Sequence, residues 1–414
     1  MQAIVAACLL WSSTAMAATY YVSPSGNDSN AGTEAAPWKT LQKVAGYPLN
    51  AGDVVYLRAG VYPGYITLSR SGAAGNPITL AAYPGEQPIV EGSGRTTNTA
   101  NAWNPDERLI YISGSYVTVK GLELRNSAGF GIRVTGGNYA VIDSVHAHNN
   151  YFAGVYFLWS SYGTVVNSVV HDSYDYGSGG TGGGGDSDCM GSSAGNTWPP
   201  PTVYGHHTFR NNVVYNCSDD GIDTWTSQYN TIEGNVSHHA GYSNASNGGS
   251  NSIGQPIGNG NGFKLGKGGY NTVRNNVAYN NLNAGFDDNS GPNSLIYNNT
   301  AYNNQVNFSI YTPGMTLMNN ISFSGNVSTS GNPVQSNNNW NLGLTATNAW
   351  FVSVDPASPN FLRLAAGSPA IDRGTTAGLS GITYSGAAPD LGAFEYNTST
   401  TNLPPAAPRG LKAQ

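Results

Sequence analysis

The chain has 414 residues, of which 54 are glycine and only 10% are charged. Soluble domains usually carry about 25% charged residues, so this composition excludes long helices rich in Glu and Lys and favours short strands joined by tight turns. The formal net charge of −6 argues against nucleic acid or an anionic membrane as a partner.

The first residues have the features of an export signal. Residues 3–11 form an apolar stretch, and Ala15, Met16 and Ala17 form an A-x-A cleavage site. We therefore expect residues 1–17 to be a signal peptide and the mature protein to be secreted to the extracellular space. No later segment reaches the roughly 18 apolar residues that a membrane span requires.

Residues 18–396 are expected to form one all-β domain. In its first part, residues 18–120, the segment "PWKTLQKVAG" (residues 37–46) predicts a short helix that caps the first coils. In its last part, residues 326–396, the segments "SPAIDRG" and "PDLGAFEY" are expected to close the other end. Residues 397–414 are rich in Thr, Asn and Pro, as in a linker to a further module.

The central part, residues 121–325, repeats a short motif. A polar column is formed by Ser144, Ser168, Asn212, Asn235, Asn276, Asn299 and Asn320, and an apolar residue stands three places before each, from Val141 to Leu317. A second, apolar column is formed by Ile132, Val155, Met190, Ile222, Phe263, Phe286 and Phe308. Such units bury their apolar faces only by stacking, which predicts a right-handed parallel β-helix, a solenoid with three strands per coil.

The apolar column has three long steps, from Val155 to Met190, from Met190 to Ile222 and from Ile222 to Phe263. Insertions of this size are commonly functional, and these place long loops on one side of the same coils. Tyr174, Tyr176, Trp198 and Trp225 flank this region, where their rings could stack on sugars or only pack.

The same coils carry the acidic stretch "SDDGID". Side chains alternate across a strand, so the repeat register places Asp188 against Asp220, with Asp219 and Asp223 alongside. Clustered carboxylate oxygens are the ligands that Ca²⁺ prefers, whereas neither a Cys pair nor a convincing His set accompanies the cluster to suggest Zn²⁺. A solvated acidic patch is the simpler alternative.

Lys264 stands beside this cluster, because it follows an apolar anchor one coil after Asp223. A lysine acts as a general base only when its pKa falls, and a nearby dication and partial burial both lower it. The alternative is a surface lysine without a role. Lys267 could hold a substrate carboxylate. Arg210, Glu233 and Arg274 share one column elsewhere and predict a structural charge ladder.

The cysteines of the chain give little further information about its function. Once the signal is removed, Cys189 and Cys217 remain, and they could form one disulfide bridge in an oxidising compartment.

The motifs "DDGID" and "GNGFKLG" resemble those of polysaccharide lyase family 9, the right-handed β-helix pectate lyases. The resemblance implies a calcium ion on Asp219, Asp220 and Asp223, with Asp188 as the fourth ligand by register and Asp186 as its rival. It also implies that Lys264 is the catalytic base.

A cation next to a base suits proton abstraction beside a carboxylate, as in β-elimination at C5 of a uronic acid. We therefore expect a secreted, monomeric, calcium-dependent lyase that acts on an acidic polysaccharide, foremost polygalacturonate. Two alternatives stay open. An inverting hydrolase of the polygalacturonase type would need two carboxyl groups about 6.5–9.5 Å apart and would leave Lys264 unused. A non-enzymatic carbohydrate-binding β-helix would use calcium only for rigidity.

Overall fold

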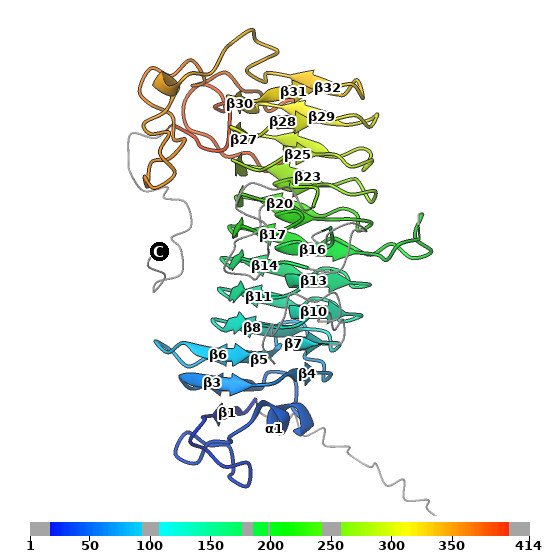
Figure 1. Cartoon of the computed structure of the whole chain (residues 1–414), viewed down its shortest axis with the longest axis vertical. Helices are drawn as coiled ribbons and strands as arrows, with labels where there is room; N and C mark the ends of the chain where they lie inside the picture. The colour runs from blue at the N-terminus through cyan, green and yellow to red at the C-terminus, as the bar shows by residue number, and fades with distance from the viewer. Residues whose placement is uncertain (1–16, 93–106, 176–184, 198, 242–257, 397–414) are drawn as a thin grey trace, which may run out of the picture.

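The computed structural model describes residues 17–92, 107–175, 185–197, 199–241 and 258–396. The expected signal peptide before residue 17, the expected linker at 397–414, Tyr176 and Trp198 lie outside these ranges. Within them, the chain winds into three long parallel sheets of 12, 10 and 10 strands, which run side by side along the molecule (Figure 1).

Sheet 1 contains, in spatial order, β1 (Thr19–Val22), β2 (Val54–Leu57), β5 (Ile78–Ala82), β8 (Val117–Lys120), β11 (Val141–Asp143), β14 (Thr164–Val166), β17 (Thr208–Arg210), β20 (Thr231–Glu233), β23 (Thr272–Arg274), β26 (Leu295–Tyr297), β29 (Thr316–Met318) and β32 (Val334–Ser336).

Sheet 2 contains β4 (Ile66–Leu68), β7 (Arg108–Ile112), β10 (Phe130–Thr135), β13 (Ala153–Leu158), β16 (Met190–Ser193), β19 (Ile222–Asp223), β22 (Phe263–Lys264), β25 (Ala284–Asp287), β28 (Val306–Ser309) and β31 (Asn326–Ser328). Sheet 3 contains β3 (Gly60–Pro63), β6 (Pro88–Glu91), β9 (Glu123–Arg125), β12 (His146–His148), β15 (Val169–His171), β18 (Val213–Tyr215), β21 (Val236–His238), β24 (Val277–Tyr279), β27 (Thr300–Tyr302) and β30 (Ile321–Phe323).

From β5 on, neighbours within a sheet are three strands apart in the chain, so each coil gives one strand to each sheet. This confirms the parallel β-helix with three strands per coil. The interior is filled by the apolar column predicted from the repeat. Phe263, Phe286 and Phe308 are fully buried, and their rings stack with centroids 4.9 and 5.1 Å apart.

The N-terminal cap is a single short helix, α1 (Leu41–Gly46), which lies at the end of the solenoid next to β1 (Figure 1). The Thr40 side chain caps it by accepting a hydrogen bond from the Lys43 backbone N–H, and Leu41 and Val44 face the core. The helix begins later than the predicted residue 37 because Thr40 is in an extended conformation, as an N-cap requires.

The polar column forms a ladder inside the turns from sheet 1 to sheet 3. Asn235 Nδ2 donates to Asn276 Oδ1 (3.0 Å), and Asn276 Nδ2 donates to Asn299 Oδ1 (3.0 Å). The ladder runs from Asn212 to Asn338, and all of its members are buried. Each side-chain amide thus forms a hydrogen bond with an Asn of the neighbouring coil, which is how stacked Asn residues stabilise repeated β structures.

The predicted column is wrong by one residue at its first member. Val141 pairs with Thr164, and Ile142 pairs with Val165, so Val145 rather than Ser144 occupies the position of Ser168. Ile142 is fully buried whereas Val141 is not. A shift of one residue exchanges the two faces of a strand, and burial of the larger Ile decides the register here.

The C-terminal segment lies along the flank of the solenoid rather than across its open end. Leu391 and Ala393 pack against Ile321 and Phe323 on the outer face of sheet 3. The interior column is instead continued by Trp340, whose ring centroid lies 5.1 Å from that of Phe308. A short 3₁₀ helix, η2 (Asn348–Trp350), also lies here, because its last residue, Trp350, is part of the same apolar cluster as Leu391 and Ile321.

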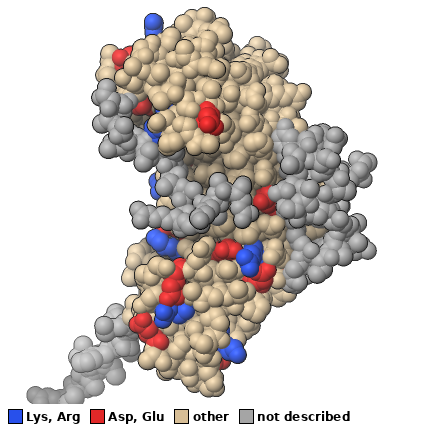
Figure 2. Space-filling view, turned by 60° about the vertical axis from the view of Figure 1, so that its left-hand side comes forward, with Lys and Arg blue, Asp and Glu red and all other residues tan. Residues whose placement is uncertain are grey.

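Figure 2 shows one face of the molecule on which most of the surface is uncharged and acidic and basic side chains lie together in the lower half. The ion pairs of the described residues include Arg58 with Glu86 and Lys120 with Asp143. Within the described residues, no helix has the length and apolar character that crossing a membrane requires.

Candidate active site

The register of sheet 2 brings the predicted site residues onto neighbouring coils. Asp223 on β19 pairs with Gly191 on β16 and with Lys264 on β22. Because Asp223 and Lys264 each follow a buried anchor, their side chains point out of the solenoid.

Three carboxylates converge at this point. Each of Asp188, Asp220 and Asp223 offers an oxygen, and these oxygens lie within 4.8 Å of one another. All three side chains are buried, with at most 5% of each residue exposed. Asp186, the rival of Asp188, is exposed and does not join this group.

Asp219 adjoins the three carboxylates without entering the closest group. It is 2% exposed, its Oδ1 accepts a hydrogen bond from the Asn259 backbone N–H (2.5 Å), and its Oδ2 lies 4.0 Å from Lys264 Nζ. The four predicted ligands therefore occupy one site, with Asp219 held slightly apart by its backbone contact.

Lys264 Nζ lies among the acids. It is 2.9 Å from Asp220 Oδ2 and 3.2 Å from Asp223 Oδ2, and only 7% of the residue is exposed. Lys264 therefore forms ion pairs with two of the three converging carboxylates.

Burial and the neighbouring charges shift Asp188, Asp219 and Asp223 toward their neutral forms. Burial, only partly offset by Lys264, raises the pKa of Asp223 to about 6. Burial, followed by the charges of the neighbouring acids, also raises the pKa values of Asp188 and Asp219 well above the usual range.

Lys264 does not show the lowered pKa expected for a base. Burial lowers its pKa, but the charges of Asp220, Asp223, Asp219 and Asp188 together outweigh that effect and raise it well above the usual value. The expected lowering therefore requires something that neutralises these acids.

The donor set fits a hard divalent cation. Asp188 Oδ1 and Asp223 Oδ1 are buried and make no hydrogen bond. Asp220 Oδ2 is also buried, and it contacts Lys264 Nζ as an ion pair. Buried carboxylate oxygens without partners are costly, and a cation that prefers about six to eight oxygen ligands relieves that cost.

The site opens into a cavity of about 620 Å³, whose lining includes Asp188, Asp219, Asp223, Lys264, Trp225 and Tyr156. The Trp225 ring lies near two lysines, with Lys264 Nζ 5.6 Å and Lys267 Nζ 5.0 Å from its centroid. Tyr174 is 2% exposed and is not among the described residues that line this cavity, so its ring is not presented to a ligand there.

A disulfide joins Cys189 and Cys217, with 5.4 Å between their Cα atoms. Both cysteines are fully buried. Cys189 directly follows Asp188, and Cys217 lies two residues before Asp219, so the bridge ties together the two segments that carry the acids.

Two further residues belong to the site and were not predicted. Asp287 pairs with Lys264 on the next coil, and burial raises its pKa to about 7. Tyr156 pairs with Gly191 on the preceding coil and lines the cavity. Both follow an anchor of the apolar column, so the repeat alignment held the signal that could have found them.

The three residues of the predicted charge ladder do share one column of sheet 1, and none of them lines the cavity, but the ion pair that the described residues form within the column is that of Glu233 with Arg274. Arg210 pairs with Glu233, and Glu233 pairs with Arg274, whose Nη2 lies 3.2 Å from Glu233 Oε2.

Known proteins share this fold and align with most of the length of this chain, at about 30% identity. Residues 20–332 match the family model described as "Pel9A-like, right handed beta helix region". The chain belongs to this family. It is 31% identical to pectate lyase L of Paenibacillus polymyxa, over 89% of this chain and 86% of that protein. It is also 29% identical to pectate lyase L of Dickeya dadantii, over 91% and 90% of the two chains.

The solved structure of the pectate lyase Pel9A superposes with a TM-score of 0.78 and 29% identity, covering 92% of this chain and 96% of that one. Together these relationships show that the chain is an enzyme, a polysaccharide lyase. They exclude the non-enzymatic alternative and disfavour a hydrolase.

Proposed function

We propose that this enzyme is a calcium-dependent lyase that cleaves a uronic-acid polymer, foremost polygalacturonate, by β-elimination. The observation that carries the proposal is that Lys264 Nζ contacts Asp220 and Asp223, two of three converging buried carboxylates, beside one cavity. The relatives named pectate lyases support the choice of polymer.

Asp188, Asp220 and Asp223 would hold the calcium ion, and Asp219 stands close enough to complete the set. When bound, Ca²⁺ would neutralise the carboxylate on C5 of the sugar and stabilise the negative charge that develops there. The acids are buried, and excluding water from the site strengthens this electrostatic effect.

Lys264 would take the C5 proton. With the oxygens of Asp220 and Asp223 engaged by a dication, the lysine loses the attraction that now keeps it protonated, and burial then lowers its pKa. The proton moves to Nζ, the C5–H electrons form the C4–C5 double bond, and the C4–O bond breaks. The oxygen that leaves then takes up a proton, and no water is consumed.

The substrate would lie along the cavity beside Trp225. A tryptophan face offers an apolar platform for a sugar ring, and the nearby Lys267 ammonium can pair with the carboxylate of an adjacent uronic acid.

The geometry disfavours an inverting hydrolase. That mechanism needs two carboxyl groups about 6.5–9.5 Å apart, with room for a water between them. Here the oxygens of the three acids lie within 4.8 Å of one another, and two of the acids, Asp220 and Asp223, contact Lys264.

The deciding experiment is a panel of uronic-acid polysaccharides, each digested with and without a calcium chelator. We expect the ultraviolet absorbance of an unsaturated product to rise with polygalacturonate, to vanish with chelator and to return on adding Ca²⁺. New reducing ends without that absorbance would show hydrolysis and refute the proposal.

We also propose that the protein is exported, because residues 1–17 have the pattern of a signal peptide. Expression of the full gene in a secreting host, followed by N-terminal sequencing of the extracellular enzyme, should find Ala18 first. Retention of an intact leader inside the cells would contradict this.

A further inference from the structure

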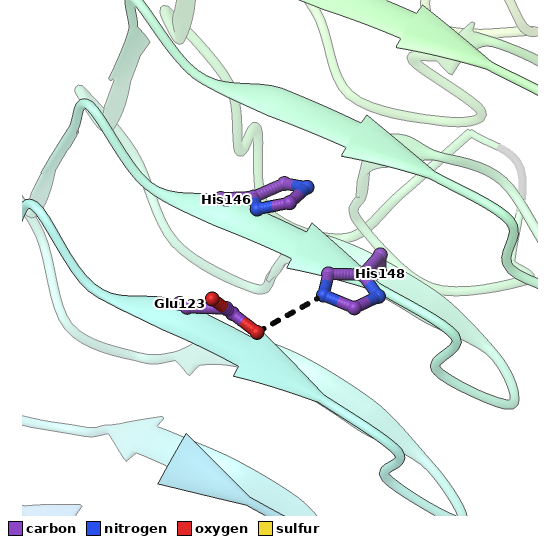
Figure 3. Close-up of side chains that lie close together, drawn as sticks. All are labelled: Glu123, His146 and His148. Atoms are coloured by element: carbon purple, nitrogen blue, oxygen red, sulfur yellow. Dashed lines mark hydrogen bonds and ion pairs between the residues drawn. The ribbon is translucent and has the colours of Figure 1, made fainter. Parts of the chain in front are cut away.

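A second cluster of metal-ligating side chains lies on sheet 3, on coils that come before those of the lyase site. Glu123 on β9 and His146 and His148 on β12 each offer one ligand atom, and these atoms lie within 4.8 Å of one another (Figure 3). None of these residues takes part in the proposed elimination.

The strand register explains why they meet. His146 pairs directly with Glu123, and His148 pairs with His171 on the next coil. Ala147, between the two histidines, is fully buried, so both imidazoles point outward on the same side of the strand.

Hydrogen bonds around the cluster bear on which ring nitrogens can bind a metal. His148 Nδ1 lies 2.7 Å from Asn149 Oδ1, an oxygen that can only accept, so Nδ1 donates to it. His148 Nε2 is then the nitrogen that faces Glu123 Oε1, at a distance of 3.4 Å. In a neutral ring this Nε2 has a lone pair, and it and the Glu123 oxygen are two acceptors that a cation between them would satisfy.

The same reasoning applies to His146. His171 Nδ1 lies 2.7 Å from Asp172 Oδ2 and donates to it, so a neutral His171 ring has its lone pair on Nε2. His146 Nε2 lies 2.8 Å from that atom and donates to it in this arrangement, which puts the lone pair of His146 on Nδ1. Figure 3 shows a ring nitrogen of His146 on the side facing Glu123.

His146 Nδ1 also provides independent support for a ligand. The residue is only 8% exposed, and Nδ1 is buried without any hydrogen-bond partner. A neutral imidazole binds a metal through one ring nitrogen, and Nδ1 is the nitrogen of His146 that has no partner here.

We propose that Glu123, His146 and His148 form a binding site for a divalent transition metal, foremost Zn²⁺. Two imidazoles and a carboxylate suit zinc, whereas calcium prefers oxygen ligands alone. Zinc ligands lie about 2.0–2.2 Å from the ion, so binding draws the three outward-facing side chains together by small rotations. The site clamps the coils of β9 and β12 to each other.

Two neighbours shape the site. Arg125 Nη1 donates to Glu123 Oε1 (3.0 Å) and must share or yield that oxygen when a cation binds. The bond from His148 to Asn149 is an outer contact of the kind that orients metal-binding imidazoles. The competing arrangement is a proton on His148 Nε2 that forms an ion pair with Glu123.

The test uses the full chain without a histidine tag, kept in excess Ca²⁺ so that the aspartate cluster is filled. Titration calorimetry with Zn²⁺ should show one saturable site per chain. We expect His148→Gln and Glu123→Gln each to weaken zinc binding by at least about tenfold. His206→Asn is the matched control, because His206 lies in a separate surface stack between Tyr162 and Tyr229, and it should leave zinc affinity unchanged.

A second readout needs no variant. Co²⁺ added to the unaltered protein in excess Ca²⁺ should give the visible absorption bands of a histidine-bound ion, and Zn²⁺ should remove them. If zinc does not bind saturably, if both variants bind it as well as the parent, or if cobalt gives no such bands, the proposal is overturned and the Glu123–His148 contact is a protonated ion pair.

Discussion

Asp223 and Lys264 occupy the same position on neighbouring strands, β19 and β22, and their side chains meet with Oδ2 and Nζ 3.2 Å apart. Asp223, a proposed metal ligand, thus lies one strand away from Lys264, the proposed base. In the proposed cycle, the charge state of Lys264 depends on what occupies the acids.

Replacing Lys264 by alanine should remove the base. We expect kcat on polygalacturonate to fall by about 10²- to 10⁴-fold, the usual contribution of a general base. Calcium binding should persist, because the acids lose a competing ammonium group. Lys267→Ala is the matched control and should raise KM more than it lowers kcat. Parental kcat in Lys264→Ala would exclude it as the base.

Replacing Asp223 by asparagine should weaken calcium binding while preserving shape. The calcium concentration for half-maximal activity should rise by about tenfold or more, because a charged ligand becomes neutral. Asp287→Asn serves as the comparison, since Asp287 lies beside Lys264 but outside the carboxylate group. Equal calcium requirements in the two variants would argue against the assignment.

Removing the disulfide should loosen the acid-bearing segments. The bridge closes a loop with a sequence separation of 28, which predicts a loss of about 2–4 kcal/mol of unfolding free energy in the double variant Cys189→Ala, Cys217→Ala. Denaturant unfolding measures this loss, and calcium titration of the folded variant should show weaker binding. Unchanged stability would mean that packing alone holds the two coils together.

His207 should make the fold sensitive to acid. It is 1% exposed, its Nδ1 accepts a hydrogen bond from the Gly163 backbone N–H (3.0 Å), and burial lowers its pKa to about 3. The unfolded chain therefore binds a proton first as pH falls. Stability present above pH 6.5 should decline by about 1.4 kcal/mol per pH unit as pH falls toward 3. The difference in unfolding free energy between parent and His207→Gln, followed from pH 7 to 4, isolates this effect. A pH-independent difference would contradict it.

The asparagine ladder should be costly to interrupt. Asn276→Ala leaves the buried Asn235 Nδ2 and Ile232 carbonyl without the partners that Asn276 provides. Since each unsatisfied buried group costs about 1–3 kcal/mol, we expect a loss of at least about 2 kcal/mol in denaturant unfolding. Asn326→Ala, at an exposed strand position, is the control and should change stability little.

The repeat made the fold and the lyase site predictable. Stacked coils convert sequence spacing into spatial position, so aligning Ile222 with Phe263 was enough to place Asp223 beside Lys264. The same alignment selected Asp188, which Asp186 could have replaced in the motif alone.

Other features lay beyond that reasoning. The position of the C-terminal segment depends on non-repeating contacts, such as that of Leu391 with Ile321, which no periodicity encodes. The pKa of Lys264 depends on how closely four acids surround it. The histidine cluster was not predicted because Glu123 precedes the first aligned unit of the repeat, and that unit was itself placed one residue out of register.

Loop length and strand register are independent in this molecule. Ile222 and Phe263 are 41 residues apart and Phe263 and Phe286 only 23, yet both pairs stack in the same register. Asp186, Asn196 and Asn259, one from each long insertion, line the cavity, so the insertions can vary without moving the reactive groups. Grafting the long insertions of one relative onto another should alter polymer preference and leave the chemistry of cleavage intact.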